Sequence, residues 1–203
     1  MIAIIDYGTG NIHSVAKALQ LFGAKTIVAD KAGQIEPCDK IVLPGVGAFD
    51  DAMLELQKQG LKAAILKHIK NKKPFLGICL GMQLLFETSS EASRTKGFAM
   101  LKGSVERFSE NKNIKVPHMG WNQLKIRNKE CPLLKGVADG SYVYFCHSYY
   151  PKPHDAGISV ATTVYGIEFS SIVWQDNIYG VQFHPEKSQA LGLKMVENFV
   201  KLC

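Results

Sequence analysis

Short apolar runs alternate with longer amphipathic segments through the first half of the chain. Buried strands are predicted where four such runs occur, at residues 2–6, 27–29, 40–43 and 74–78. Helices are predicted where apolar residues recur at helical spacing, at residues 12–22, 50–58 and 61–71, with a further helix beginning at 80–86. This alternation predicts a parallel sheet with helices on both of its faces.

The pattern changes after about residue 88. Residues 88–96 are polar and predict a surface loop. Short strands, mostly antiparallel, are predicted at 103–108, 121–126, 141–147, 158–164, 168–174 and 178–183. A closing helix over 190–202 offers a core face made by Leu191, Met195, Phe199 and Leu202. The expected fold is therefore one α/β domain over residues 1–203, with a mostly parallel central sheet, helices on both faces and an added antiparallel region in the second half.

Composition is ordinary for a soluble globular protein of 203 residues, with 46% hydrophobic and 21% charged residues. The five cysteines are scattered and include no C-x-x-C pair, so neither a zinc ribbon nor a disulfide framework is expected. A reducing cytoplasm fits this cysteine usage. The apolar N-terminal run lacks a basic start and reaches Asp6, which predicts a strand and not a signal peptide.

The net charge of +6 leaves open an affinity for nucleic acid. The lysines are spread along the chain, however, and no long basic run with interleaved aromatic residues occurs. We therefore expect solvated lysine faces, no nucleic-acid partner and no membrane partner. His68 lies in the most lysine-rich helix and is expected to be solvated.

Cys79 stands between a predicted strand and a predicted helix, with Gly77 and Gly81 two residues to either side. This is the Gly-x-nucleophile-x-Gly layout of a nucleophile elbow, with a thiol in place of a hydroxyl. The small neighbours allow a sharp turn, and the following helix N-terminus favours the thiolate. A lone cysteine on an apolar strand is more often a core residue, but the flanking glycines favour the nucleophile.

His184 and Glu186 follow the last predicted strand and are separated by Pro185. In extended chain both side chains point to one side. A thiol nucleophile needs a base, and the base needs a carboxylate that orients it, so the pair completes a candidate triad with Cys79. His-x-Glu also begins a zinc-deaminase motif, but the Pro-Cys-x-x-Cys that would follow is absent, so no metal is expected.

No cofactor is expected either. The Gly-x-Gly at Gly8 and Gly10 lacks the third glycine of a dinucleotide site. The glycine-rich loop at 44–49 and Cys79 both follow parallel strands, so they are expected to be neighbours at the carboxyl edge of the sheet. Cys146 precedes His147 on an alternating strand, so we expect it to face the opposite way and lie in the core.

Together the Gly-Ile-Cys-Leu-Gly-Met-Gln segment, the Pro-Gly-Val-Gly loop and His-Pro-Glu resemble the class I, or triad, glutamine amidotransferases over the whole chain. Four further stretches are similar to the glutaminase subunits of imidazole glycerol phosphate synthases, in histidine biosynthesis. They are Asp6-Tyr-Gly-Thr-Gly-Asn11, Pro117-His-Met-Gly-Trp-Asn122, Tyr144-Phe-Cys-His-Ser-Tyr149 and His184-Pro-Glu-Lys-Ser188.

The resemblance implies hydrolysis of glutamine to glutamate and ammonia by Cys79, His184 and Glu186. It implies an oxyanion hole made by the backbone N–H groups of Leu80 and Gly47. It assigns glutamine binding to Gln83 and to the segment His147, Ser148 and Tyr149, the latter largely through backbone. A plain surface position for Gln83 and a core position for Tyr149 remain open alternatives.

The resemblance also implies a partner, since ammonia released into water is lost to chemistry. The family passes it to a (β/α)8-barrel cyclase subunit in a heterodimer, which makes imidazole glycerol phosphate and an aminoimidazole carboxamide nucleotide. Docking or gating is assigned by resemblance to Asn11, Met119, Trp121, Asn122, Tyr144 and Lys187. The main alternative is a free-standing triad glutaminase that feeds a pyridoxal phosphate or aminodeoxychorismate synthase. An independent cysteine hydrolase and a silent binding subunit are weaker alternatives.

Overall fold

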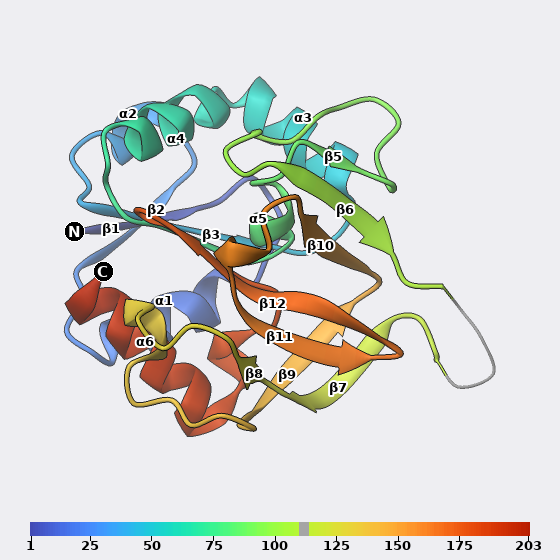
Figure 1. The fold of residues 1–203 in the computed structure, drawn as a ribbon. Coiled ribbons are helices and arrows are strands. Elements are labelled where there is room, and N and C mark those ends of the chain that lie inside the picture. The colour runs from blue at the N-terminus through green and yellow to red at the C-terminus, as the bar shows by residue number, and fades with distance from the viewer. Residues whose placement is uncertain (110–113) are drawn as a thin grey trace.

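An eight-stranded sheet forms the centre of the computed structural model, which describes residues 1–109 and 114–203 (Figure 1). Across the sheet the strands are β2 (Thr26–Ala29), β1 (Ile2–Ile5), β3 (Lys40–Gly45), β4 (Phe75–Cys79), β13 (Ile178–Val181), β12 (Ile167–Gln175), β11 (Ser159–Tyr165) and β8 (Lys125–Ile126). The first five are parallel, and the last three run antiparallel to their neighbours. This confirms the predicted fold class.

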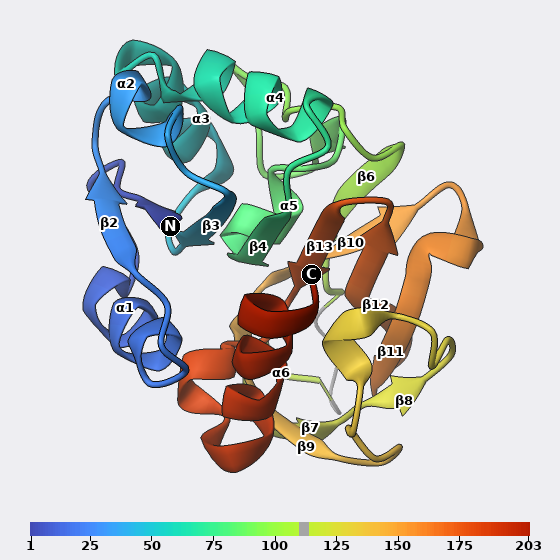
Figure 2. The ribbon, with the colours of Figure 1, turned by 90° about the vertical axis from the view of Figure 1, so that its left-hand side faces the viewer.

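Helices cover both faces of this sheet (Figures 1 and 2). On one face lie α1 (Ile12–Gln20) and α6 (Gln189–Leu202); on the other lie α2 (Ala32–Ile35), α3 (Phe49–Lys58) and α4 (Leu61–Lys70). Strand alternation explains the two layers: in β1, Ala3 and Ile5 join one hydrophobic core, and Ile2 and Ile4 join the other. All four side chains are therefore buried, as expected for an inner parallel strand.

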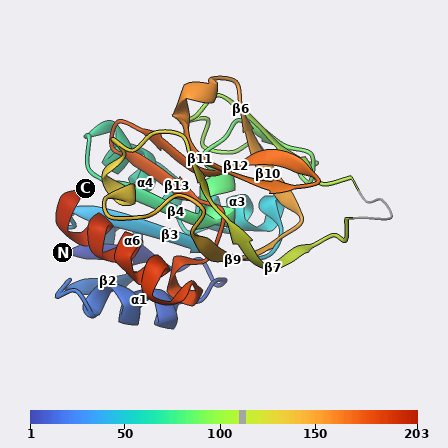
Figure 3. The same cartoon turned by 60° about the horizontal axis from the view of Figure 1, so that its bottom comes forward.

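Smaller sheets extend the second half of the chain. One is a three-stranded sheet of β10 (Tyr149–Pro153), β6 (Gly103–Arg107) and β5 (Thr88–Ser89). The other pairs β7 (His118–Gln123) with β9 (Tyr142–His147), next to α6 (Figure 3). Short helical turns complete the fold: α5 (Leu80–Gln83), η1 (Pro132–Leu134), η2 (Ala156–Ile158) and η3 (Pro185–Lys187).

Several predicted boundaries were wrong. The strand predicted at 121–126 is broken at Leu124 into β7 and β8, which belong to different sheets. The helix predicted to start at 80–86 does begin at Leu80, but it is only the single turn α5, after which tighter turns continue to Phe86 before β5. Strand β10 was not predicted because it contains two prolines; it tolerates them at the edge of its sheet.

Two burial predictions were also wrong. His68 is buried and not solvated, because its face of α4 turns toward the sheet and its Nε2 lies 3.2 Å from the carbonyl oxygen of Pro74. Burial lowers the pKa of His68, so the ring is neutral at pH 7. Leu202 is exposed because it lies in the last turn of α6, whereas Met195 and Phe199 are buried as expected.

In the described ranges, every helix is too short or too polar to cross a membrane.

Candidate active site

Cys79 lies at a sharp bend between β4 and α5. Its φ of 54° lies in the left-handed region, which a non-glycine residue occupies at an energetic cost. Glycines allow the bend to pack against its surroundings: a Cβ on Gly81 would lie 1.9 Å from the carbonyl oxygen of Leu43, and one on Gly77 would lie 2.5 Å from that of Gly81. The sequence pattern therefore folds as a nucleophile elbow.

Behind the cysteine, His184 and Glu186 form a buried pair. The Nδ1 atom of His184 lies 3.0 Å from Oε1 of Glu186, and their side chains are 5% and 2% exposed. The pair was expected in extended chain, but Pro185 begins the turn η3. This turn brings the Glu186 carboxylate next to the His184 ring. Burial alone would lower the pKa of His184, yet hydrogen bonds to Cys79 and Glu186, and their negative charges, raise it to about 10.

This electrostatic arrangement favours the protonated form of His184. The ring lies 3.0 Å from the Glu186 carboxylate and lines the same cavity as Cys79. An imidazolium beside a sulfur stabilises the thiolate, which is the nucleophilic form. Because α5 has only one turn, its helix dipole is weak, and the positive charge near the sulfur comes from His184.

The neighbouring strand β9 fixes the position of His184. The backbone N–H of His184 donates to the carbonyl oxygen of Tyr144 at 3.0 Å. The Ser188 hydroxyl accepts from the Tyr144 N–H at 3.0 Å and donates to the His184 carbonyl at 2.7 Å. The base is therefore attached to β9 at two points, and β9 also carries the pocket residue His147.

A cavity of about 300 Å³ opens in front of the cysteine. As expected, the glycine-rich loop is its neighbour, because Gly45 is paired with Cys79 in the parallel register of β3 and β4. The structure brings most of the sequence-predicted site residues together in the cavity wall, namely Gly47, Cys79, Leu80, Gln83, His147, Ser148, Tyr149, His184 and Lys187. Gln83 is buried there, and its Nε2 donates to the Tyr149 carbonyl oxygen at 3.0 Å.

Besides Glu186, which lies behind His184, five predicted residues lie outside that wall. Asn11 caps α1, since its side-chain oxygen accepts from the N–H of Ser14. Asn122 donates to the carbonyl oxygen of Val164 at 2.9 Å. The remaining three form what we call the β7 patch, defined as the exposed residues Met119 and Trp121 and the half-buried Tyr144, against which Trp121 packs. Met119 and Trp121 are 62% and 45% exposed.

The structure adds residues that no sequence signal marked. The Gln182 side chain is fully buried, and its Nε2 lies 3.6 Å from the Cys79 sulfur. The carboxylate of Glu91 lines the cavity and accepts from the N–H of Phe49 at 2.9 Å. Glu91 comes from the polar 88–96 loop, whose composition gave no reason to select it. The proximity of Gln182 to His184 in sequence was the one available clue.

Cys146 was expected in the core, and this was wrong. It faces away from His147 as the alternation predicts, on the side of β9 that is paired with Met119, and is only half-buried. Its backbone carbonyl oxygen lies 3.9 Å from the Cys79 sulfur, and the residue lines the cavity.

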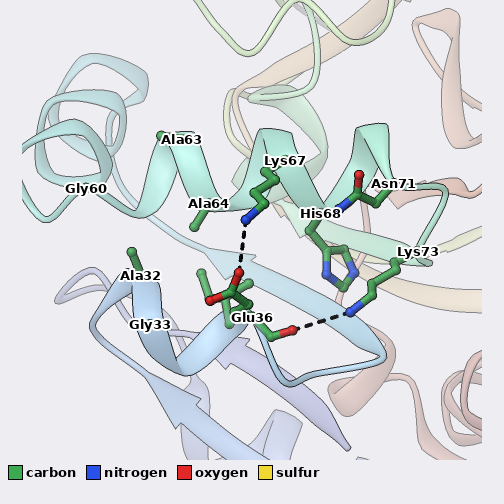
Figure 4. A pocket seen from close by; sticks show the side chains of 11 residues that line it. Ala32, Gly33, Glu36, Gly60, Ala63, Ala64, Lys67, His68, Asn71 and Lys73 are labelled. Atoms are coloured by element: carbon green, nitrogen blue, oxygen red, sulfur yellow. Dashed lines mark hydrogen bonds and ion pairs between the residues drawn. The ribbon is translucent and has the colours of Figure 1, made fainter.

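A larger cavity, of about 460 Å³, lies between α2 and α4 (Figure 4). None of the predicted site residues lines it. Its cations already have partners: Lys67 pairs with Glu36 at 2.9 Å, and Lys73 donates to the Cys38 carbonyl oxygen at 2.8 Å. Size alone therefore does not mark it as the reactive site, whereas the smaller cavity holds a nucleophile beside an ordered base.

Within residues 1–109 and 114–203, no three His, Cys, Asp or Glu side chains are grouped so as to hold a metal ion.

Comparison with known proteins shows the family to which the chain belongs. The model of the class-I glutamine amidotransferase family matches residues 3–203. The chain belongs to this family. It is thus a glutamine amidotransferase, as the sequence resemblance predicted.

Curated relatives show which members of this family the chain is similar to. The chain is 49% identical over 202 residues to the imidazole glycerol phosphate synthase subunit HisH of Methanocaldococcus jannaschii, covering 100% of both chains. It is 49% identical to the HisH subunit of Caldanaerobacter subterraneus subsp. tengcongensis, covering 98% of this chain and 97% of the relative. The amidotransferase is therefore HisH-like, and the predicted function as the glutaminase subunit of such a synthase is confirmed at this level.

The solved structure of PurLQS from Thermotoga maritima resembles the amidotransferase in fold. It is 19% identical with a TM-score of 0.76, covering 98% of this chain and 96% of the other. At this identity the likeness concerns the fold alone.

Proposed function

We propose that Cys79, His184 and Glu186 hydrolyse the side-chain amide of L-glutamine, and that the ammonia passes to a cyclase subunit. The thiolate attacks the amide carbon and a tetrahedral oxyanion forms. The C–N bond then breaks, His184 gives its proton to the departing ammonia, and a glutamyl thioester remains on Cys79. Water, deprotonated by His184, attacks the thioester and releases glutamate and the thiolate. The observation that supports this sequence is the buried His184–Glu186 pair, whose histidine lines the same cavity as Cys79.

Oxyanion stabilisation is assigned to two backbone N–H groups. That of Leu80 follows the nucleophile directly, and that of Gly47 comes from the adjacent loop; both residues line the cavity. Gly47 has a φ of 95°, which glycine adopts without strain, so this loop can present an N–H toward the site. One such donor typically contributes about 3 kcal/mol to lowering the barrier.

Glutamine binding is assigned to the wall opposite the loop. Gln83 and the backbone of residues 147–149 line the cavity beside the sulfur. The Glu91 carboxylate supplies the negative charge that an α-ammonium group requires. A carboxylate and backbone donors in one cavity fit an α-amino acid better than a plain amide.

The partner is inferred from the name of the relatives and from the surface. Those relatives are subunits of a synthase, and the β7 patch leaves Met119 and Trp121 exposed. Large exposed apolar side chains are typical of docking surfaces. We assign this patch, with Asn11, Asn122 and Lys187, to contact with a (β/α)8-barrel cyclase in a cytoplasmic heterodimer. All five cysteines are free thiols, which suits that compartment.

The test is release of glutamate from glutamine by the chain alone, and with its cyclase subunit and the nucleotide ligand of that subunit. We expect weak release alone and strong stimulation in the complex. Cys79→Ala should abolish glutamine-dependent synthesis and leave synthesis from ammonium salts intact. Cys146→Ala, which removes a nearby thiol and keeps the backbone carbonyl that lies beside Cys79, is the matched control and should retain most of the activity.

Full activity alone, unchanged by the cyclase, would instead indicate a free-standing glutaminase that serves another synthase. Loss of the ammonium-dependent reaction in the Cys79→Ala complex would contradict the division of labour between the subunits.

A further inference from the structure

Two histidines form a buried contact outside the triad. The Nδ1 atom of His118 lies 3.0 Å from Nε2 of His147, and the residues are 3% and 6% exposed. The His118 ring is stacked between Phe145 and Tyr165, with centroids 4.8 and 4.0 Å away. His147 belongs to the cavity wall, whereas His118 lies behind it and does not line the cavity.

The partners of these rings fix the position of every proton. Nδ1 of His147 lies 2.8 Å from the Tyr149 carbonyl oxygen, which only accepts, so this Nδ1 carries the hydrogen. In a neutral His147 the Nε2 atom must then accept, so Nδ1 of His118 donates to it. Nε2 of His118 accepts in turn from the Asn122 amide at 3.3 Å. Hydrogen bonds therefore point one way, from Asn122 through both rings to Tyr149.

Burial keeps both imidazole rings in the neutral state, which this one-way series of hydrogen bonds requires. Loss of solvation lowers the pKa of His118 to about 4. For His147, burial outweighs the hydrogen bond to Tyr149 and, with repulsion from His118 and His184, lowers the pKa to about 3. A proton added to either ring would leave two donors facing each other without an acceptor.

The Tyr149 carbonyl oxygen connects this series of hydrogen bonds to the reactive site. The oxygen accepts from Nδ1 of His147 at 2.8 Å and from Nε2 of Gln83 at 3.0 Å. The same Gln83 nitrogen donates to Oε1 of Gln182 at 3.1 Å, and Nε2 of Gln182 reaches the Cys79 sulfur. One carbonyl thus holds the bend at residues 147–149 and the orientation of the Gln83 amide, which in turn bonds to the buried Gln182.

We propose that His118 is a positioning residue for glutamine binding: its Nδ1–H holds His147 in the Nδ1-protonated tautomer, and His147 then fixes the Tyr149 carbonyl and the 147–149 backbone. The inference rests on the proposed function, since it assigns the 147–149 segment to glutamine. Without the His118 donor, Nε2 of His147 is a buried acceptor with no partner, and the ring is free to adopt the other tautomer. That tautomer puts a lone pair against the Tyr149 carbonyl.

Two substitutions separate hydrogen bonding from packing. His118→Phe keeps an aromatic ring between Phe145 and Tyr165 but has no donor. His118→Asn loses the ring, yet its amide nitrogen is placed where Nδ1 stood and still donates to His147. Glutamate release is measured with the cyclase subunit present, and melting temperatures are recorded for both variants.

We expect His118→Phe to raise KM for glutamine about tenfold, the usual scale for a buried acceptor left unpaired, with kcat changed less than threefold. His118→Asn should stay close to the wild-type KM even where its melting temperature falls. The reverse order, with His118→Asn impaired and His118→Phe normal, would show that the ring only fills space and would overturn the proposal.

A second measurement does not depend on activity or on folding of the variants. Proton–nitrogen NMR of the wild-type imidazoles reports each tautomer, and we expect both His118 and His147 to carry their hydrogen on Nδ1 at pH 7. An Nε2-protonated His147 would overturn the inference. If the tautomers are as expected while the wild-type complex releases no glutamate, the proposed function fails and the hydrogen-bond order stands.

Discussion

His184 combines two opposing influences on its charge. Removal from solvent disfavours the imidazolium, whereas Glu186 and Cys79 favour it, and the second influence is larger. His147, equally buried, has no carboxylate among its hydrogen-bond partners and is therefore neutral. Two histidines in the wall of one cavity thus have opposite protonation states. His184 has a proton that it can transfer, whereas the neutral His147 has one donor and one acceptor nitrogen in fixed positions.

Glu186→Gln keeps the shape of the orienting side chain and removes its charge. We expect kcat for glutamate release to fall roughly 10⁴-fold, as seen when the carboxylate of a triad is neutralised. The pKa of His184 should fall from about 10 toward the ordinary value, because one of its two anionic partners is lost. Glutaminase assays and an NMR titration of the His184 ring are the measurements.

Glu197→Gln serves as the control for this substitution. Glu197 is paired with Lys194 and Lys201 on α6, so its loss should not change kcat. A wild-type His184 that titrates near pH 6.5 would contradict the ion-pair assignment.

At the scale of elements, the bend from β4 to α5 depends on close backbone contacts. Gly81 packs on Leu43 of the neighbouring strand β3, and Gly77 packs on the first turn of α5. These contacts bring the start of α5 directly over the strand that leads to the glycine-rich loop. The separation between nucleophile and loop is therefore set by the parallel pairing of β3 and β4.

Gly81→Ala should disrupt that packing. Its Cβ would lie 1.9 Å from a backbone oxygen that cannot move without breaking the sheet, so we expect a loss of roughly 3 kcal/mol or more in the free energy of unfolding. Gly33→Ala is the matched control, because nothing lies within 4 Å of its Cβ and it is helical. Denaturant unfolding should show the control unchanged or slightly more stable.

Sequence periodicity was sufficient to predict a helix or strand where one or both faces of that element are buried. Strands β1, β3 and β4 and helices α1, α3 and α4 lie within a few residues of their predicted bounds. It was insufficient for β10, whose prolines are tolerated only because the strand lies at an edge, and for η3, whose turn depends on contacts with β9. The triad residues carried local motifs, whereas Glu91 and Gln182 gain their positions from tertiary packing.

On the scale of the whole molecule, the reactive cavity and the β7 patch lie on the antiparallel extension and its junction with the parallel sheet. Trp121 is 45% exposed, and its ring packs edge-on against Tyr144, with centroids 6.0 Å apart. Tyr144 also accepts the His184 N–H through its carbonyl. A subunit that covers the β7 patch would therefore touch the strand that holds His184 in place.

Trp121→Ala should weaken association with the cyclase subunit. An aromatic side chain at the centre of an interface commonly contributes 2 kcal/mol or more, so we expect Kd to rise at least about 30-fold. Leu21→Ala is the control: that side chain is 65% exposed at the far end of α1, and Kd should not change. Calorimetric titration measures both, and an unaltered Kd for Trp121→Ala would rule out the patch as the docking centre.

Two adjacent residues at the start of β3 hold the two ends of the described chain. Asp39 pairs with the N-terminal ammonium of Met1, and Lys40 donates to the carbonyl oxygens of Phe199, Val200 and Cys203. Strand β3 runs from there toward the cavity, so both ends lie at the opposite edge of the sheet (Figure 2). A surface anchor or fluorescent label attached at this edge would therefore leave the cavity and the β7 patch unobstructed.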